Sequence, residues 1–249
     1  MQQVSSTVAT KSLPLPIARR SRPSPRKLHS SFIGFAIVFA VIVLIGFSRT
    51  FFLPMARGTL SKPWIVHLHG AFFFAWTGLL VAQAMLAATK RLRLHRKVGS
   101  IAGWLVIPML VLGSVVATRD TIHDFKAGDG DGALSFYYGE LVDLLMFGVL
   151  AGGAMLLRHK PDYHKRWVIL GNLGLIGAAI GRIPEISTFF LYIYLGLIAS
   201  VGAYDIASRR AVHPATFIGA AVLLTLGLTE ERIGSTALWL NAAHHLLRV

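Results

Sequence analysis

The chain has 249 residues, of which 54% are hydrophobic and 14% charged, and its mean hydropathy is +0.61. A soluble domain of this length carries far more charge. The formal net charge of +14 would suit a nucleic-acid binder, but a basic excess confined to one set of short loops is what membrane topology produces. The composition therefore predicts an integral membrane protein that does not bind nucleic acid. The absence of Cys excludes disulfides, thiolate metal sites and cysteine nucleophiles.

The chain begins with a basic segment and continues with seven apolar stretches. Residues 1–31 are rich in Ser, Pro and Arg and contain no acid, so we expect a disordered cytosolic tail, with an organellar transit peptide as the alternative. A bilayer core about 30 Å thick needs roughly 20 apolar residues per helix. The stretches that meet this need are Phe32–Ser48, Trp64–Ala88, Val98–Thr118, Tyr138–Leu157, Trp167–Ile183, Phe189–Tyr204 and Pro214–Leu228.

These stretches predict an all-α fold, a polytopic membrane protein with about seven transmembrane helices in residues 32–230. A short amphipathic C-terminal tail follows at 231–249. The first and sixth stretches are short, so one of them is expected to tilt or to re-enter the membrane.

Charged residues divide between the two sides of this map. The N-terminal tail and the loops after the second, fourth and sixth stretches hold 17 of the 25 Lys and Arg residues, while nine of the 11 acids lie on the other side. Basic loops stay in the cytoplasm. We therefore expect a cytoplasmic N-terminus, a periplasmic C-terminus, and contacts between the cytosolic loops and anionic phospholipid headgroups.

An internal repeat relates two pairs of stretches. Aligning His95 with His164, 69 residues apart, superimposes the second and third stretches on the fourth and fifth. Two such helix hairpins are expected to pack as a four-helix bundle. The fifth stretch carries small residues at three- and four-residue spacing, which allow close approach of helices in lipid. We expect it to be central and to contact a second small-residue face; the two sets are Gly171, Gly174, Gly177, Gly181 and Gly148, Gly152, Gly153.

Short motifs around this repeat resemble a layout found in uncharacterised bacterial multipass membrane proteins, which are grouped as domains of unknown function. The residues that carry the resemblance are His67-Leu68-His69-Gly70, Trp76, Gln83, Arg91, Leu94-His95-Arg96 with Gly99, and His164-Lys165-Arg166 with Arg182. It covers roughly residues 60–215. The resemblance implies a fold and a place in the bacterial inner membrane, and it implies no reaction.

Ionisable residues inside a membrane segment are expensive and indicate a functional site by default. One cluster is expected near the periplasmic side, from His67, His69, Glu140, Asp143, Arg182 and Glu185. The simpler interpretation is a structural ion pair between Arg182 and Glu185, or one of the other carboxylates. The alternative is a divalent metal or haem site, for which the expected ligands are His69, Glu140 and Asp143.

A second cluster is expected near the cytosolic side and contains His95, His164 and Gln83. Two repeat-related histidines at similar depth are able to ligate a haem b iron from both sides. Because both lie in strings of Lys and Arg, helix capping or phospholipid contact is the competing interpretation.

Three function classes follow from these clusters. The first, which the repeat histidines favour, is a b-type haem or quinone-linked redox protein. The second is a small-molecule or ion transporter that uses Glu140, Asp143 and Arg182, and the third is a metal-dependent membrane hydrolase that uses His69 with the same carboxylates. Tyr192, Tyr194 and Tyr204 would either line a cleft for a quinone or serve packing. Whether the protein is an enzyme stays open at this point.

Overall fold

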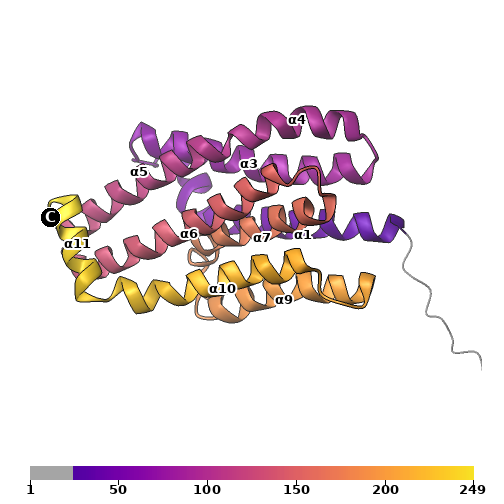
Figure 1. The fold of residues 1–249 in the computed structure, drawn as a ribbon. Helices are drawn as coiled ribbons and strands as arrows, with labels where there is room; N and C mark the ends of the chain where they lie inside the picture. Colours follow the sequence, from indigo (N-terminus) through magenta and orange to yellow (C-terminus); the bar gives the residue numbers. More distant parts are fainter. Residues whose placement is uncertain (1–24) are drawn as a thin grey trace, which may run out of the picture.

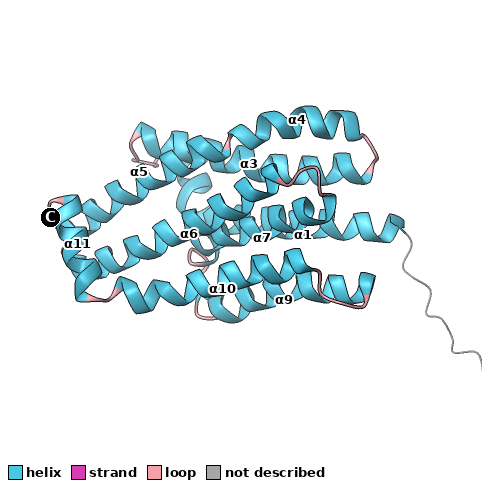
Figure 2. Cartoon of the chain, in the orientation of Figure 1, coloured by secondary structure: helices cyan, strands magenta, loops and turns pink. Residues whose placement is uncertain are grey.

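The computed structural model describes the backbone of residues 25–249 and the side chains from residue 32 onward. In this part of the chain every regular element is a helix (Figure 2). The predicted basic tail lies outside the described residues as far as residue 24, and α1 begins at Pro25. The helices are α1 (Pro25–Phe47), η1 (Ser48–Phe52), α2 (Leu53–Ala56), α3 (Trp64–Ala88), α4 (Leu92–Trp104), α5 (Val106–Asp124), η2 (Phe125–Asp129), α6 (Asp131–Leu156), α7 (Pro161–Ile180), α8 (Pro184–Ser187), α9 (Phe190–Arg209), α10 (Pro214–Gly234) and α11 (Ala237–Leu247).

The long helices run side by side along one axis, and α11 crosses one end of the bundle (Figure 1). We call the end with the α3–α4, α6–α7 and α9–α10 turns the basic end, and the opposite end, where α11 lies, the acidic end. Five helical segments are long and apolar enough to cross a membrane, namely 32–56, 64–88, 92–129, 131–156 and 190–209. The described chain is therefore an all-α, multipass membrane protein.

Several helices are longer than the sequence predicted. The second predicted stretch has the bounds of α3, but α1 continues through a π-helical turn and α2 to Ala56. The two stretches that looked short, the first and the sixth, therefore both belong to segments of sufficient length. The helical segment of 38 residues from Leu92 to Asp129 is roughly 57 Å long at 1.5 Å per residue, nearly twice the bilayer core. Its basic first turns consequently extend to the depth of the headgroups or beyond.

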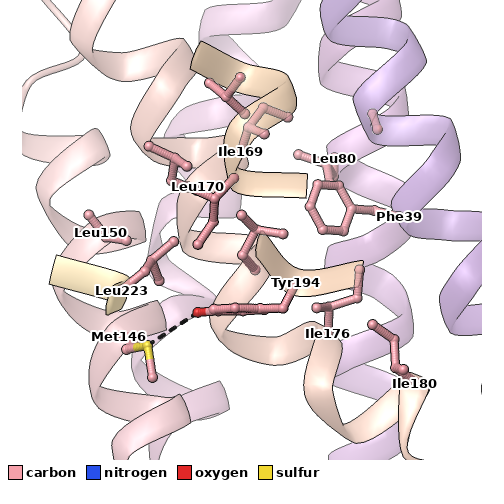
Figure 3. Packing of buried hydrophobic residues seen from close by; sticks show 14 of the residues in the cluster. Phe39, Leu80, Met146, Leu150, Ile169, Leu170, Ile176, Ile180, Tyr194 and Leu223 are labelled. Atoms are coloured by element: carbon pink, nitrogen blue, oxygen red, sulfur yellow. Dashed lines mark hydrogen bonds between the residues drawn. The ribbon is translucent and has the colours of Figure 1, made fainter. Parts of the chain in front are cut away.

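The core is organised around α7. Its residues Ile169, Leu170, Ile176 and Ile180 are at most 3% exposed and meet apolar side chains from α1, α3, α6, α9 and α10 (Figure 3). Tyr194 of α9 reaches into this cluster and donates a hydrogen bond to the sulfur of Met146 on α6 (Figure 3). The prediction that the fifth stretch is central is therefore confirmed.

Glycines set the close contact between α6 and α7. A Cβ added at Gly171 would lie 3.0 Å from the backbone nitrogen of Ala151, and one at Gly174 would lie 3.0 Å from the carbonyl oxygen of Asp143. The predicted partner surface on α6 is only partly correct. Gly153 does face α7, where the ring of Trp167 fills its space, but Gly148 faces Leu110 of α5 and Gly152 has no neighbour within 4 Å.

Candidate functional site

At the basic end, the structure brings His95 and His164 together. Their ring centres are 6.3 Å apart and their ring planes are almost perpendicular, at 88°. His95 lies in the first turn of α4 and His164 in the first turn of α7. Two residues 69 positions apart thus meet because each starts the second helix of a hairpin.

Each of these histidines is tied to the helix that precedes it. Nδ1 of His164 lies 2.8 Å from the carbonyl oxygen of Ala154, and Nδ1 of His95 lies 3.1 Å from the carbonyl oxygen of Gln83. A carbonyl oxygen only accepts hydrogen bonds, so the contact of His164 places its ring hydrogen on Nδ1. For His95 the side-chain nitrogen of Gln83 lies closer to Nδ1, at 2.6 Å, and donates to it, so the ring hydrogen of His95 is on Nε2.

Gln83, near the end of α3, contacts His95 through its side-chain amide. Its side-chain amide lies within hydrogen-bond distance of Nδ1 and of the backbone of both His95 and Gly99. The three residues that the sequence grouped at this end are therefore neighbours, and the α3–α4 hairpin holds the His95 ring through Gln83.

Toward the acidic end, carboxylates from two helices occupy space left by glycines. Asp143 lies near the middle of α6, and its Oδ2 lies 3.5 Å from a Cβ placed on Gly177 of α7. Glu230 of α10 lies against Gly139, with 3.6 Å between its Oε2 and a Cβ placed there. The charges of Glu230 and Glu140 both act on Asp143. All three carboxylates are partly buried.

No basic side chain among residues 32–249 forms an ion pair with Glu140, Asp143 or Glu230. Arg182 interacts with Glu140 only through longer-range electrostatics, without a hydrogen bond or an ion pair. Its guanidinium instead donates to the carbonyl oxygen of Ala178 and lies 4.6 Å from the ring centre of Phe47. We call Glu140, Asp143 and Glu230 the carboxylate cluster.

The expected partnership of Arg182 with Glu185 is not formed. Glu185 pairs with Arg49 at 2.8 Å, and both side chains of this pair are exposed. His69 stacks on Phe73 with ring centres 4.2 Å apart, and its Nδ1 is buried without a hydrogen-bond partner.

In the described part of the chain no three His, Asp or Glu side chains are arranged to hold a metal ion. His69, Glu140 and Asp143 are therefore not gathered into a ligand set in this structure. The geometry gives no support to metal-dependent hydrolysis at this end.

Sequence reasoning missed a buried ionic network at the basic end. Arg166 of α7 is 1% exposed and Asp205 of α9 is 0% exposed. Nε of Arg166 donates to Oδ1 of Asp205 at 2.9 Å, and the Nη2 group donates to the same oxygen. The start of α10 joins the network, because the backbone N–H of His213 (3.0 Å) and the hydroxyl of Thr216 both donate to Oδ2 of Asp205.

A signal for this network was present in the sequence. Asp205 directly follows the predicted sixth stretch, where an acid on the basic side of the membrane is unusual, and Arg166 precedes the fifth stretch. The sequence analysis assigned both residues to loops, because the positive-inside rule counts the charges of each loop and takes no account of ion pairs between them.

The three tyrosines of α9 do not line one cleft. Tyr194 is 8% exposed within the core, Tyr192 is 74% exposed, and the ring of Tyr204 packs edge-on against Phe32. These positions indicate packing and lipid contact.

No protein-family model matches this chain, and comparisons with curated proteins and with solved structures gave no match. The chemistry of the two clusters therefore has to carry the functional argument.

Proposed function

We propose that the protein is a proton-coupled secondary transporter, with the carboxylate cluster as its proton-binding site. The observation that carries the proposal is Asp143, a carboxylate in the middle of a long apolar helix with no basic partner. An ionised carboxylate in a low-dielectric interior is costly unless a cation or a proton neutralises it. Three such groups on neighbouring helices favour a protein whose function includes binding and releasing the neutralising ion.

The placement of Asp143 agrees with transporter architecture. Substrate and coupling-ion sites of secondary transporters lie near the bilayer midplane, between repeated helical units. Asp143 is halfway along α6, and α6 packs against α5, α7, α10 and α11. Glu230 enters from α10, outside the two repeated hairpins, so relative motion of α6 and α10 would change the distance between the carboxylates.

The topology we propose for this transporter has seven membrane spans. Besides the five segments above, α7 and α10 run the same axis and carry their charged residues near one end. With an odd number of spans, the N-terminus is cytoplasmic and the C-terminus periplasmic in a bacterial inner membrane, in line with the basic loops. The α3–α4 and α6–α7 hairpins form the repeat in this arrangement.

A chemical test of the cluster needs no knowledge of the substrate. Dicyclohexylcarbodiimide reacts with protonated carboxyl groups in apolar surroundings. It should modify Asp143, Glu140 or Glu230 in the purified protein and leave the exposed Glu231 unmodified, as read by peptide mass spectrometry. Modification confined to exposed acids would overturn the proposal.

A functional test follows in proteoliposomes that contain the pH-sensitive dye pyranine. Imposed Na⁺ or K⁺ gradients should drive proton flux in the parent protein. Asp143→Asn and Glu230→Gln should abolish the flux, whereas Glu231→Gln, on the neighbouring exposed residue, should retain it. Flux that is absent from the parent, or equal in all variants, would contradict proton-coupled cation transport.

A further inference from the structure

We infer that Tyr194 is the hydrogen-bond donor that stabilises the ionised form of Asp143, by moving its hydroxyl from the sulfur of Met146 to the carboxylate once the proton has left. The inference rests on the proposed function, because it adds a residue to the same proton-binding site. Three features carry it: the acceptor that the hydroxyl uses in this structure, the place of two aromatic rings of α9 beside Asp143, and the charged groups around this carboxyl.

The hydroxyl of Tyr194 is held by a weak acceptor. Tyr194 is 8% exposed, and its hydroxyl donates to the sulfur of Met146 at 3.6 Å (Figure 3). A thioether sulfur accepts hydrogen bonds only weakly, whereas a buried tyrosine hydroxyl usually has a full partner. Packing accounts for the burial of the ring but not for this choice of acceptor. The hydroxyl is therefore able to change to a stronger acceptor close by.

Asp143 lies beside this hydroxyl. Met146 follows Asp143 by three residues, so both side chains lie on one face of α6. Oδ2 of Asp143 and the ring of Phe190 both border the place where Gly177 has no side chain, at 3.5 and 3.6 Å from a Cβ placed there. Phe190 stacks on Tyr194 with ring centres 5.6 Å apart and ring planes at 28°. These contacts put the two rings of α9 next to Asp143.

The charged groups around Asp143 are all acidic. Glu140 of its own helix and Glu230 of α10 act on it electrostatically, and α7 faces it with Gly177. The charges of Asp143 and Glu230 in turn both act on Tyr194. Because no basic side chain among residues 32–249 pairs with these carboxyl groups, ionised Asp143 needs a neutral donor, and Tyr194 brings one.

The charge on Asp143 determines which acceptor the hydroxyl prefers. A hydrogen bond to an ionised carboxylate is roughly twice as strong as one between neutral groups. Protonated Asp143 has no such advantage, and the hydroxyl stays on Met146. After the proton has left for solvent, the carboxylate attracts the hydroxyl, and Tyr194 keeps its own hydrogen throughout. Since Tyr194 belongs to α9, this exchange couples release of the proton to the position of α9 against α6.

The test measures the proton on Asp143 independently of transport. The purified full chain is treated with dicyclohexylcarbodiimide over a pH series, and peptide mass spectrometry gives the midpoint pH at which labelling of Asp143 falls by half. Tyr194→Phe removes the donor and should raise this midpoint by roughly 1 pH unit, the size expected for one hydrogen bond to a charged group. Tyr192→Phe, on a tyrosine of the same helix that is 74% exposed, should keep the midpoint of the parent.

A variant of the acceptor should shift the midpoint in the opposite direction. Met146→Leu keeps a similar volume and removes the sulfur, so that only the protonated form of the site loses a hydrogen bond. Its midpoint should be lower than that of the parent by less than about 1 pH unit, because the lost acceptor is weak. In the Tyr194→Phe background the same change should leave the midpoint where it is, since no hydroxyl is left to move.

The outcomes separate this inference from the proposed function. A Tyr194→Phe midpoint that equals or falls below that of the parent, with or without a lower melting temperature, would overturn the inference and leave Tyr194 with a packing role. Absence of Asp143 labelling at every pH would overturn both the inference and the proton-binding site. If the two opposite shifts are found but the parent shows no proton flux in proteoliposomes, transport alone is contradicted and the role of Tyr194 stands.

Discussion

Asp205 of α9 accepts hydrogen bonds from the guanidinium of Arg166 on α7, and neither side chain is more than 1% exposed. Arg166 and His164 are two residues apart and so point to opposite sides of α7. The start of this helix is consequently held by an ion pair on one side and meets the His95 ring on the other.

Breaking this buried pair should be expensive. Asp205→Ala removes the buried one of the two carboxylates that pair with Arg166 and leaves only Asp162, at 3.1 Å, so the loss of stability should approach the roughly 3–5 kcal/mol of a broken buried pair. The measurement is unfolding in detergent, followed by circular dichroism. The double variant Arg166→Met/Asp205→Leu should recover most of the loss, because an apolar pair of similar volume carries no uncompensated charge.

The exposed pair Arg49–Glu185 offers a matched contrast. Its side chains are 62% and 58% exposed, and exposed ion pairs contribute little. The Glu185→Ala variant should therefore have the same unfolding midpoint as the parent protein. Equal losses for Asp205→Ala and Glu185→Ala would show that burial does not set the strength of the Arg166 pair.

Alanine substitutions at two glycines of α1 distinguish the effect of helix packing from the effect of helix propensity. A Cβ on Gly46 would overlap the carbonyl oxygen of Ala179 on α7, whereas Gly34 has nothing within 4 Å. Gly46→Ala should destabilise the protein by roughly 1–3 kcal/mol, since α1 must move away from α7. Gly34→Ala should be neutral or stabilising by under about 1 kcal/mol. Thermal melts that rank the two variants in the reverse order would rule out this contact.

The docking of α11 should depend on pH. A hydrogen bond to the carbonyl oxygen of Val249 and another to Asp131 raise the pKa of His244 above its ordinary value of 6.5. A raised pKa means that the stabilisation is fully present below the ordinary value and is lost as the pH rises through the raised one. The protection factors of the α11 amides, which correct for the intrinsic pH dependence of exchange, should therefore be larger at about pH 5.5 than at about pH 8.5.

His244→Ala should remove most of this pH dependence. His245→Ala alters the neighbouring exposed residue and should preserve it. The contact between Trp239 and the carbonyl oxygen of Leu134, at 2.8 Å, involves no titrating group, so it keeps α11 in place in both variants.

The proposed topology is tested with fusions to a reporter that is active only in the periplasm. A fusion after Asp129, in the connection between α5 and α6, should be active, and a fusion after Lys160, in the α6–α7 turn, should be inactive. The opposite result would invert the map and would place the carboxylate cluster on the cytoplasmic half.

The sequence alone determined the membrane class and the helical fold. Apolar stretches of about 20 residues have no other stable solution in lipid, because only a helix satisfies its own backbone hydrogen bonds there. The bounds of α3 were predicted without error, since Pro63 precedes its first residue and Thr89-Lys90 follows its last. The central position of α7 followed from the spacing of its glycines.

Only the tertiary structure decided which charged residues are partners. Arg166 and Asp205 are 39 positions apart, and although an acid on the basic side is unusual, the sequence does not say which basic residue it meets. Likewise Glu185 was expected to join Arg182, its neighbour in sequence, but pairs with Arg49 because the end of α1 packs against the turn after α7. The repeat placed His95 and His164 at equivalent positions. Their distance came from how the two hairpins pack, because side-chain geometry depends on contacts between helices that a one-dimensional pattern does not encode.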